Sequence, residues 1–320
     1  MNDNDSAPVQ AAVNAHPVRN IVRMFFVLRT LLPHYRALRR TAAGIPDREA
    51  PARFAACLVA LGPTFVKLGR MLSTRPDVMP QAYVDALSRL QEHGPEVPLP
   101  VIYATIKVQL GHPVEEIFSG FEPKPVAAAS LAQVHRATLA DGSVVAVKVQ
   151  RPDLERLVCR DLDAMDAGLR WLYFLFPRRM KRTNLRAFLA EFRRYTLQEV
   201  DFSNEGWIID RFRANFQGRV DVKFPQVHWS QSGRHVLTLS WVEGLRLHEV
   251  AQSFDVEKRQ QLVVLLVDVM LQMFVSDGLF HAAAFHRARV CPACWFTRPY
   301  HAARVSTGSG TLAVGRDAAV

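Results

Sequence analysis

Apolar and polar residues alternate most regularly between Pro125 and Pro152, in the stretch PVAAASLAQVHRATLADGSVVAVKVQRP. The pattern predicts a strand, a tight alanine-rich loop, a second strand, a turn at Asp141-Gly142 and a third strand from Ser143 to Val149. The third strand is mostly β-branched and apolar apart from Lys148. Its ammonium group therefore needs a partner, because an unpaired charge in such a strand is unfavourable.

Helical spacing of apolar residues covers most of the remaining chain up to residue 282. The predicted helices occupy residues 51–110, where proline and glycine interrupt them, then 154–176, 183–216 and 257–276. Two further strands are predicted at Pro225–Trp229 and Val236–Trp241. The longest apolar run, Leu262 to Val275, is 14 residues long and contains Asp268. This length predicts a buried helix of a globular lobe and no transmembrane helix.

Three acidic residues, Glu199, Asp201 and Glu205, lie within the predicted helix 183–216. Their spacing of i, i+2 and i+6 cannot place all three on one helical face. Glu199 and Glu205 could both face a cleft only if the helix bends or if they serve different sides. A solvated acidic face is the alternative interpretation.

The net charge of +10, from 40 basic and 30 acidic residues, favours anionic partners such as phosphates or an anionic membrane face. A nucleic-acid partner is not predicted, because no zinc-finger, helix-turn-helix or aromatic-interleaved basic signature is present. Residues 19–40 alternate apolar residues with arginines at helical spacing. This segment is either a helix on an anionic membrane surface or a helix packed on its own protein with a solvated basic face.

Four cysteines in 320 residues do not form a disulfide scaffold, so we expect a reducing compartment. The N-terminus is polar and has no signal-peptide core, which favours a cytoplasmic location. From Ala283 onward the sequence has no helical or strand period and is predicted to be unstructured. Cys291 and Cys294 have the spacing of half a zinc site, but no second pair exists and no metal site is predicted.

Four stretches together resemble the UbiB/AarF family of atypical kinase-like proteins, which is linked to ubiquinone biosynthesis. The stretches are LGPTFVKLGRMLSTRPD, AAASLAQVHRA, VAVKVQRP and QEVDFSNE. They are similar to the family's helical extension with its Lys-x-Gly-Gln motif, its alanine-rich nucleotide loop, its lysine strand and its Glu-x-Asp motif. Their order and spacing agree with the family over about residues 50–282.

The resemblance implies a nucleotide site. Lys148 should neutralise the α- and β-phosphates of ATP, as the strand lysine does in protein kinases. Glu205 is the first choice for its ion-pair partner and Glu199 the second. Ala127, Ala128, Ala129 and Ser130 should cover the phosphates through backbone N–H groups, in a loop stiffer than a glycine-rich one. Val242 to Gly244 should lie at the adenine hinge.

The resemblance also assigns roles to the helical extension. Lys67 should reach into the nucleotide cleft, and Glu199 and Asp201 should hold the extension in place. By periodicity alone Lys67 is an ordinary solvated helix lysine. After Lys67, Leu68 and Gly69, the motif glutamine is replaced by Arg70, which puts a second cation beside Lys67.

The catalytic part of the family pattern does not follow. After Ala282 the family continues with an Asp, then His-Pro-Gly-Asn, and later an Asp-Phe-Gly that binds Mg²⁺. Ala283, Ala284 and His286 occur instead, and none of these strings is present. We therefore expect ATP and Mg²⁺ as family cofactors, with the Mg²⁺ ligands missing and no catalysis by this chain. A reading-frame change at residue 283 is the hypothesis that explains the loss of pattern.

The predicted fold is α+β: a protein-kinase-like N-lobe with an N-terminal helical extension and an incomplete helical C-lobe. The expected divisions are 1–50, 51–124 (extension), 125–241 (N-lobe), 242–282 (hinge and start of the C-lobe) and 283–320 (tail). The expected function is that of an atypical kinase or ATPase supporting ubiquinone biosynthesis, peripheral at the inner face of a membrane, with pathway proteins or lipids as partners. The alternatives are a nucleotide-binding or scaffolding pseudokinase fragment and a membrane-surface lipid-binding protein.

Overall fold

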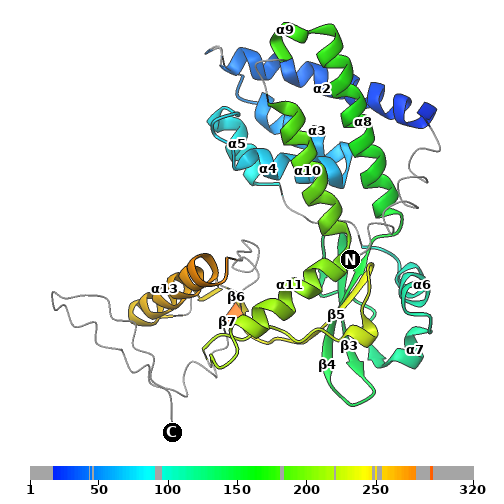
Figure 1. The fold of residues 1–320 in the computed structure, drawn as a ribbon, viewed down its shortest axis with the longest axis vertical. Coiled ribbons are helices and arrows are strands. Elements are labelled where there is room, and N and C mark those ends of the chain that lie inside the picture. The colour runs from blue at the N-terminus through cyan, green and yellow to red at the C-terminus, as the bar shows by residue number, and fades with distance from the viewer. Residues whose placement is uncertain are drawn as a thin grey trace, which may run out of the picture. The chain divides into compact units, whose positions relative to one another are not determined.

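A computed structural model gives the structure of the chain, which divides into two compact units, Met1–Trp241 and Val242–Val320 (Figure 1). Figure 1 labels most of the helices and strands. The structure describes residues 17–42, 44, 47–90, 96–180, 184–219, 221–246, 249–250, 254–278 and 289–290.

An antiparallel sheet forms the centre of one half of the first unit. Its strands follow the order β1-β3-β4-β5, and β2 pairs with the edge of β3. The turn between β3 and β4 forms as predicted, because Gly142 adopts a φ of +84° and the Asp141 carboxylate accepts the Ser143 N–H at 2.8 Å. The strand bounds are Phe118–Phe121 for β1, Ala127–Ala128 for β2, Ala132–Leu139 for β3, Val144–Gln150 for β4 and Val236–Ser240 for β5.

The two faces of the sheet are covered by different helices (Figure 1). Val145, Val147 and Val149 of β4 are fully buried in a cluster with Ile102 and Ile106 of α6 (Leu99–Leu110). The next element, α7 (Val114–Ile117), joins the same cluster and leads into β1. The opposite face packs Leu237 of β5 against Phe202 of α11 (Phe202–Asn215). Because side chains alternate along a strand, Lys148 shares the α11 face with Leu237, its cross-strand partner.

The other half of the first unit is helical. Its members are α2 (Pro17–Ala42), α3 (Ala50–Leu61), α4 (Pro63–Ser73), α5 (Gln81–Ser88), α8 (Leu154–Leu175), the short α9 (Pro177–Met180) and α10 (Leu185–Val200). One apolar cluster joins α2, α3, α4 and α5 around Leu58, Phe65 and Tyr83. A second cluster packs α8 on α10 through Val158, Leu162 and Phe192, with Leu68 of α4 against it.

This packing differs from the domain boundaries expected from the sequence. Residues 96–121 were expected in the extension, yet α6, α7 and β1 complete the core of the sheet. Conversely, α8 and α10 were expected in the sheet lobe, yet they pack on the helices of the extension. Sequence periodicity identifies a buried face without identifying the element that covers it, which explains the difference.

Two predicted elements were wrong in detail. The single helix over 183–216 is interrupted at Asp201, which ends α10 and begins α11. The strand at Pro225–Trp229 does not form: only Val227 pairs, as an isolated bridge to Leu239, and Trp229–Gln231 is a 3₁₀ turn. Pro225 cannot donate a hydrogen bond to a neighbouring strand, and the backbone of His228–Gln231 closes a local turn. These two features prevent the expected strand pairing.

In the second unit, the short strands β6 (Leu245–Arg246) and β7 (Arg289–Val290) pair, and α13 (Val256–Leu271) continues as a π-helical turn to Ser276. The sequence predicted a buried helix here, but Val264, Leu271 and Val275 are exposed at 61%, 57% and 79%. Val256–Ser276 is long and apolar enough to cross a membrane by length and composition alone, a test that core helices of soluble proteins also pass. Cys291 and Cys294, and the rest of the tail expected to be unstructured, lie outside the described residues.

Candidate functional site

The candidate site begins at Lys148 on β4, opposite Val134 of β3 and Leu237 of β5. Its Nζ lies 2.5 Å from a carboxylate oxygen of Glu205 on α11. The side chains of Lys148 and Glu205 are only 15% and 27% exposed. The ion pair therefore connects the central strand to the helix that covers this face, and it supplies the partner that a lysine in an apolar strand requires.

Phe202 lies beside the same ammonium group. The Lys148 Nζ is 4.1 Å from the centroid of the Phe202 ring, a cation–π geometry. Phe202 is itself buried against Ala132, Val227 and Leu237. The lysine head is thus held between a carboxylate and an aromatic face, while the fully buried valines of β4 point to the other side of the sheet.

The interruption at Asp201 explains how Glu199 and Glu205 reach different partners. Asp201 is the N-cap of α11, where its carboxylate accepts the Ser203 N–H at 3.0 Å. Glu205 then stands in the first turn of α11, facing Lys148. Glu199 stays on α10 and forms an ion pair with Lys67 of α4. Glu199, the second choice as partner of Lys148, therefore pairs with the extension instead.

Asp201 forms an ion pair with Arg234, in the segment before β5. Its second carboxylate oxygen accepts from Arg234 Nε at 3.2 Å, and Arg234 also donates to Glu155 at the start of α8. The resemblance implied that Glu199 and Asp201 together hold the extension. In the structure the contact with Lys67 comes from Glu199, while Asp201 caps α11 and fixes the segment that precedes β5.

The alanine-rich loop is shorter than the sequence predicted. Ala127 and Ala128 are already strand β2, and the turn to β3 closes with Ala129 N–H donating to the Ala132 carbonyl at 2.8 Å. Arg151, just after β4, donates through Nε to the Ala129 carbonyl at 2.9 Å. Burial lowers the pKa of Arg151 from its usual value. Ser130 is in this turn, which Arg151 ties to the end of the strand that carries Lys148.

The extension motif packs closely on its neighbours at Gly69. A Cβ at this position would lie 2.7 Å from Leu90 Cδ1 and 2.8 Å from Leu58 Cδ1, so a side chain would displace both leucines. Gly69 therefore lets α4 approach α3 and the end of α5. Arg70 follows on the exposed side of α4, and Val242, expected at the hinge, is the first residue of the second unit and 41% exposed.

Four residues that contribute to this arrangement were not predicted. Phe202 lies beside the Lys148 ammonium, and the buried Gln150 amide donates to the Val200 carbonyl at 2.5 Å, which joins β4 to the end of α10. Arg151 and Arg234 hold the alanine turn and the α11 cap. A polar Gln150 two residues after Lys148, on the same side of the strand, was the available signal.

A match to the ABC1 atypical kinase-like domain covers residues 89–287. The chain belongs to the ABC1 atypical kinase-like family. The UbiB resemblance is thereby confirmed, and with it the α+β kinase-like fold. An uncharacterised protein of Synechocystis sp. is 37% identical over 229 residues, 70% of this chain and 33% of that protein. The chloroplastic protein Activity of BC1 Complex Kinase 7 of Arabidopsis thaliana is 36% identical over 239 residues, 73% of this chain and 34% of that protein.

Among solved structures, a bacterial protein is also similar to this ABC1-family chain. The structure is that of a Mycobacterium tuberculosis protein in complex with erythromycin, with 27% identity and a TM-score of 0.52. The similarity covers 73% of this chain and 59% of the other. The chain spans about a third of the length of the curated relatives described above.

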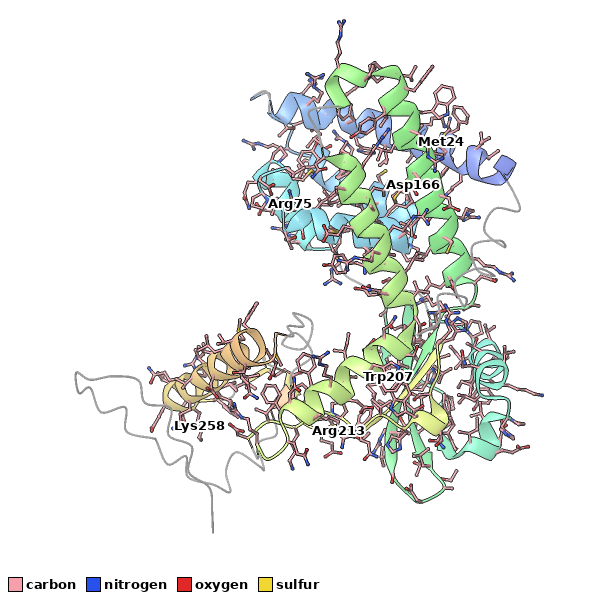
Figure 2. All side chains as sticks on the ribbon, viewed as in Figure 1. Met24, Arg75, Asp166, Trp207, Arg213 and Lys258 are labelled. Atoms are coloured by element: carbon pink, nitrogen blue, oxygen red, sulfur yellow. The ribbon has the colours of Figure 1, made fainter. Side chains whose placement is uncertain are left out.

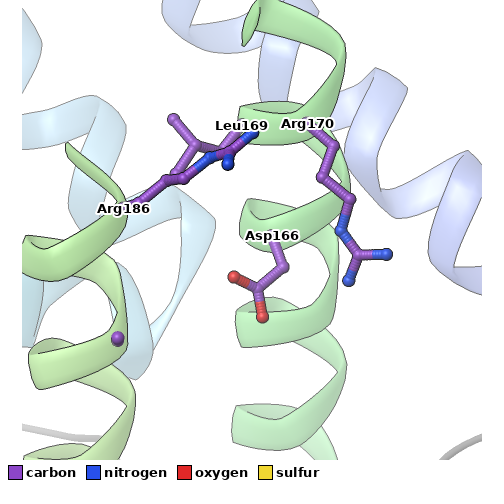
Figure 3. A pocket seen from close by; sticks show the side chains of 5 residues that line it. Asp166, Leu169, Arg170 and Arg186 are labelled. Atoms are coloured by element: carbon purple, nitrogen blue, oxygen red, sulfur yellow. The ribbon is translucent and has the colours of Figure 1, made fainter. Parts of the chain in front are cut away.

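The described residues contain no group of three His, Cys, Asp or Glu side chains placed to hold a metal ion. They do contain a cavity of about 380 Å³ between α8 and α10 (Figure 3). Asp166, Leu169, Arg170, Arg186 and Ala190 line it. None of the residues expected to bind nucleotide is among them.

Proposed function

We propose that this chain is a nucleotide-binding portion of an ABC1 atypical kinase, with ATP as its ligand. The observation that carries the proposal is the Lys148–Glu205 ion pair, which joins a central strand to its covering helix at 2.5 Å. Kinases use this type of pair to hold a lysine against the α- and β-phosphates of ATP. Membership of the family supports the same assignment.

The chemistry of the side chains fits a triphosphate. The ammonium of Lys148 would neutralise phosphate charge, and Glu205 and Phe202 would keep it in one position. The turn at Ala129 and Ser130, tied down by Arg151, would present backbone N–H groups to the phosphates. Mg²⁺ would accompany the nucleotide and share its charge.

We further propose that the chain binds nucleotide without turning it over. Neither a His-Pro-Gly-Asn nor an Asp-Phe-Gly string occurs in the 320 residues, and these carry the catalytic loop and the Mg²⁺-binding Asp of this class. The link to ubiquinone biosynthesis, including pathway proteins or lipids as partners, rests on the resemblance to UbiB and is part of the proposal.

The test is a thermal unfolding series with ATP and Mg²⁺. A ligand at a hundred times its Kd stabilises by about 2.7 kcal/mol, so Tm should rise with ATP concentration. Lys148→Ala should abolish the rise. Lys107→Ala, an exposed lysine on α6, is the matched control and should keep it.

A scaffold that binds no nucleotide is the competing function. It predicts the same Tm with and without ATP in the wild-type chain and in both variants. An equal ATP-dependent rise in wild type and Lys148→Ala would also contradict the proposed site. If the purified chain releases phosphate from ATP and Lys148→Ala does not, only the proposal that the chain is catalytically inactive is contradicted. The proposed nucleotide site would stand.

A further inference from the structure

Two stretches of the first unit account for all of the excess positive charge. They are α2, residues 17–42, and the end of α8 with the residues that follow it, 167–186. Together they contain twelve of the 40 Lys and Arg residues and none of the 30 Asp and Glu residues. The rest of the chain, with 28 basic and 30 acidic residues, has a net charge of −2. The net charge of +10 is therefore concentrated in these two stretches.

The outer face of α2 is apolar as well as basic. Met24 and Val27 are 2% and 6% exposed and pack inward. On the other side, large apolar side chains face solvent from Ile21 to Phe26 and again further along, interspersed with the exposed Arg29 and Arg36. These apolar residues are Ile21, Val22, Phe25, Phe26, Leu32 and Tyr35. A helix that only packs on its own protein would present a polar outer face instead.

The end of α8 repeats the pattern. Trp171, Phe174 and Leu175 are 51%, 79% and 53% exposed, and Phe176 follows them. Trp171, Phe174 and Leu175 are spaced i, i+3 and i+4, which is one side of α8, and the exposed Arg178 follows in α9. The rings of Trp171 and Phe174 lie edge to face at 6.4 Å.

The two segments belong to one surface region because α2 crosses α8 (Figures 1 and 2). At the crossing, a Cβ on Gly168 would lie 3.7 Å from Met24 Cγ. Arg23 Nε forms an ion pair at 2.8 Å with the fully buried Asp161, which fixes α2 on α8. The cavity beside this end of α8 adds Arg170 and Arg186, and the Arg186 guanidinium is 4.1 Å from the Tyr173 ring centroid (Figure 3).

We propose that the outer face of α2 and the exposed end of α8 form a docking surface for an anionic phospholipid bilayer. Exposed aromatic and aliphatic side chains would enter the headgroup region, and the arginines would contact lipid phosphates. A second copy of this chain is a poorer occupant, because two such surfaces would repel each other. An acidic protein partner could match the charge, but it would have to accept aromatic side chains from two crossed helices, which a fluid bilayer does readily.

The test is flotation of the full chain with vesicles of phosphatidylcholine alone and of phosphatidylcholine with phosphatidylglycerol. We expect binding to the anionic vesicles only, reduced by salt. Phe25→Glu combined with Phe174→Glu should weaken vesicle binding by about tenfold or more. Val108→Glu on α6, an apolar residue 86% exposed in the other half of the unit, is the matched control and should bind as wild type.

Tryptophan quenching by brominated phosphatidylglycerol vesicles locates the contact with conservative variants, which do not add a charge to the surface. Loss of the quenched signal in Trp171→Phe but not in Trp207→Phe is expected, since Trp207 is 65% exposed on α11. No flotation, equal binding to both vesicle types, or equal quenching losses in the two variants would overturn the proposal. So would a dimer that Phe174→Glu dissociates in the absence of vesicle binding, which would make the surface an interface between copies.

Discussion

At the scale of single residues, the site depends on how one lysine is accommodated. Lys148 was recognisable from the sequence because it interrupts an apolar strand that follows an alanine-rich turn. The resemblance ranked Glu205 before Glu199 as its partner, but the residues alone left both open, since the choice depends on where a helix ends. Phe202 could not be chosen in advance, because the contact depends on the angle at which α11 crosses the sheet. Side-chain chemistry was therefore predictable, and three-dimensional pairing was not.

His135 provides a residue-scale prediction of pH dependence. It is fully buried on β3, where Nδ1 donates to the Glu122 carbonyl at 2.9 Å and Nε2 accepts from the Gln133 amide at 3.0 Å. Burial lowers the pKa of His135, so below about pH 6.5 the unfolded chain binds more protons than the folded one. The free energy of unfolding should therefore fall as pH drops from about 6.5 through the lowered pKa.

The measurement is urea unfolding between about pH 7.5 and about pH 5. His135→Gln should be less stable than wild type at the higher pH and should show a smaller loss on acidification. His112→Gln, an exposed histidine on the turn after α6, serves as the control and should reproduce the wild-type curve. If His135→Gln and wild type lose stability in parallel, burial of a neutral His135 is not the cause.

At the scale of elements, the strand unit from Ala127 to Gln150 and the helix α8 were predicted well, because their patterns are local. The break between α10 and α11 was missed. The apolar stripe continues through it, and only the capping contact of Asp201 marks it. The place of α6 and α7 in the sheet lobe was missed for a different reason: the residues that cover them, such as Val145 of β4 and Val236 of β5, lie far away along the chain.

The cap of α11 gives an element-scale prediction. Asp201→Ala removes the side-chain acceptor for the Ser203 N–H, a change that costs about 0.5–2 kcal/mol at an N-cap. Thermal unfolding should show a lower Tm, and the Lys148–Glu205 pair should become less ordered. Asp201→Asn keeps a capping oxygen and should be closer to wild type. Equal losses for Ala and Asn would assign the effect to the ion pair with Arg234 instead.

Helix packing on the sheet gives a second prediction at this scale. A Cβ on Gly206 of α11 would lie 2.6 Å from Trp229 Cη2 and 3.3 Å from Leu237 Cδ1. Gly206→Ala should destabilise by about 1–3 kcal/mol, despite the better helix propensity of alanine. Gly168→Ala in α8 has only ordinary contacts at 3.7 Å or more and should be neutral or stabilising. Urea unfolding of both variants distinguishes crowding from propensity, and a stabilised Gly206→Ala would contradict the close approach.

At the scale of the whole molecule, the division after Trp241 predicts an independently folding first unit. The apolar clusters around Leu58, Val147, Leu162 and Leu237 draw all their members from residues before 242. A chain ending at Trp241 should therefore unfold cooperatively, with a Tm within about 4 °C of the corresponding full-length transition. A chain ending at His235 loses β5 and should not fold. Failure of the 1–241 chain to fold would show that the first unit needs the second.

The alternation of β4 has a consequence for how its length can vary. Val147 and Lys148 point to opposite faces, toward α6 and toward α11 respectively. Inserting or deleting one residue between the Asp141-Gly142 turn and Lys148 would exchange these faces, placing the ammonium among Ile102 and Ile106 and a valine against Glu205. Changes in length are tolerable in the exposed turn only where the strand register beyond it is preserved. Natural relatives of this chain should therefore show no insertions or deletions over residues 144–150.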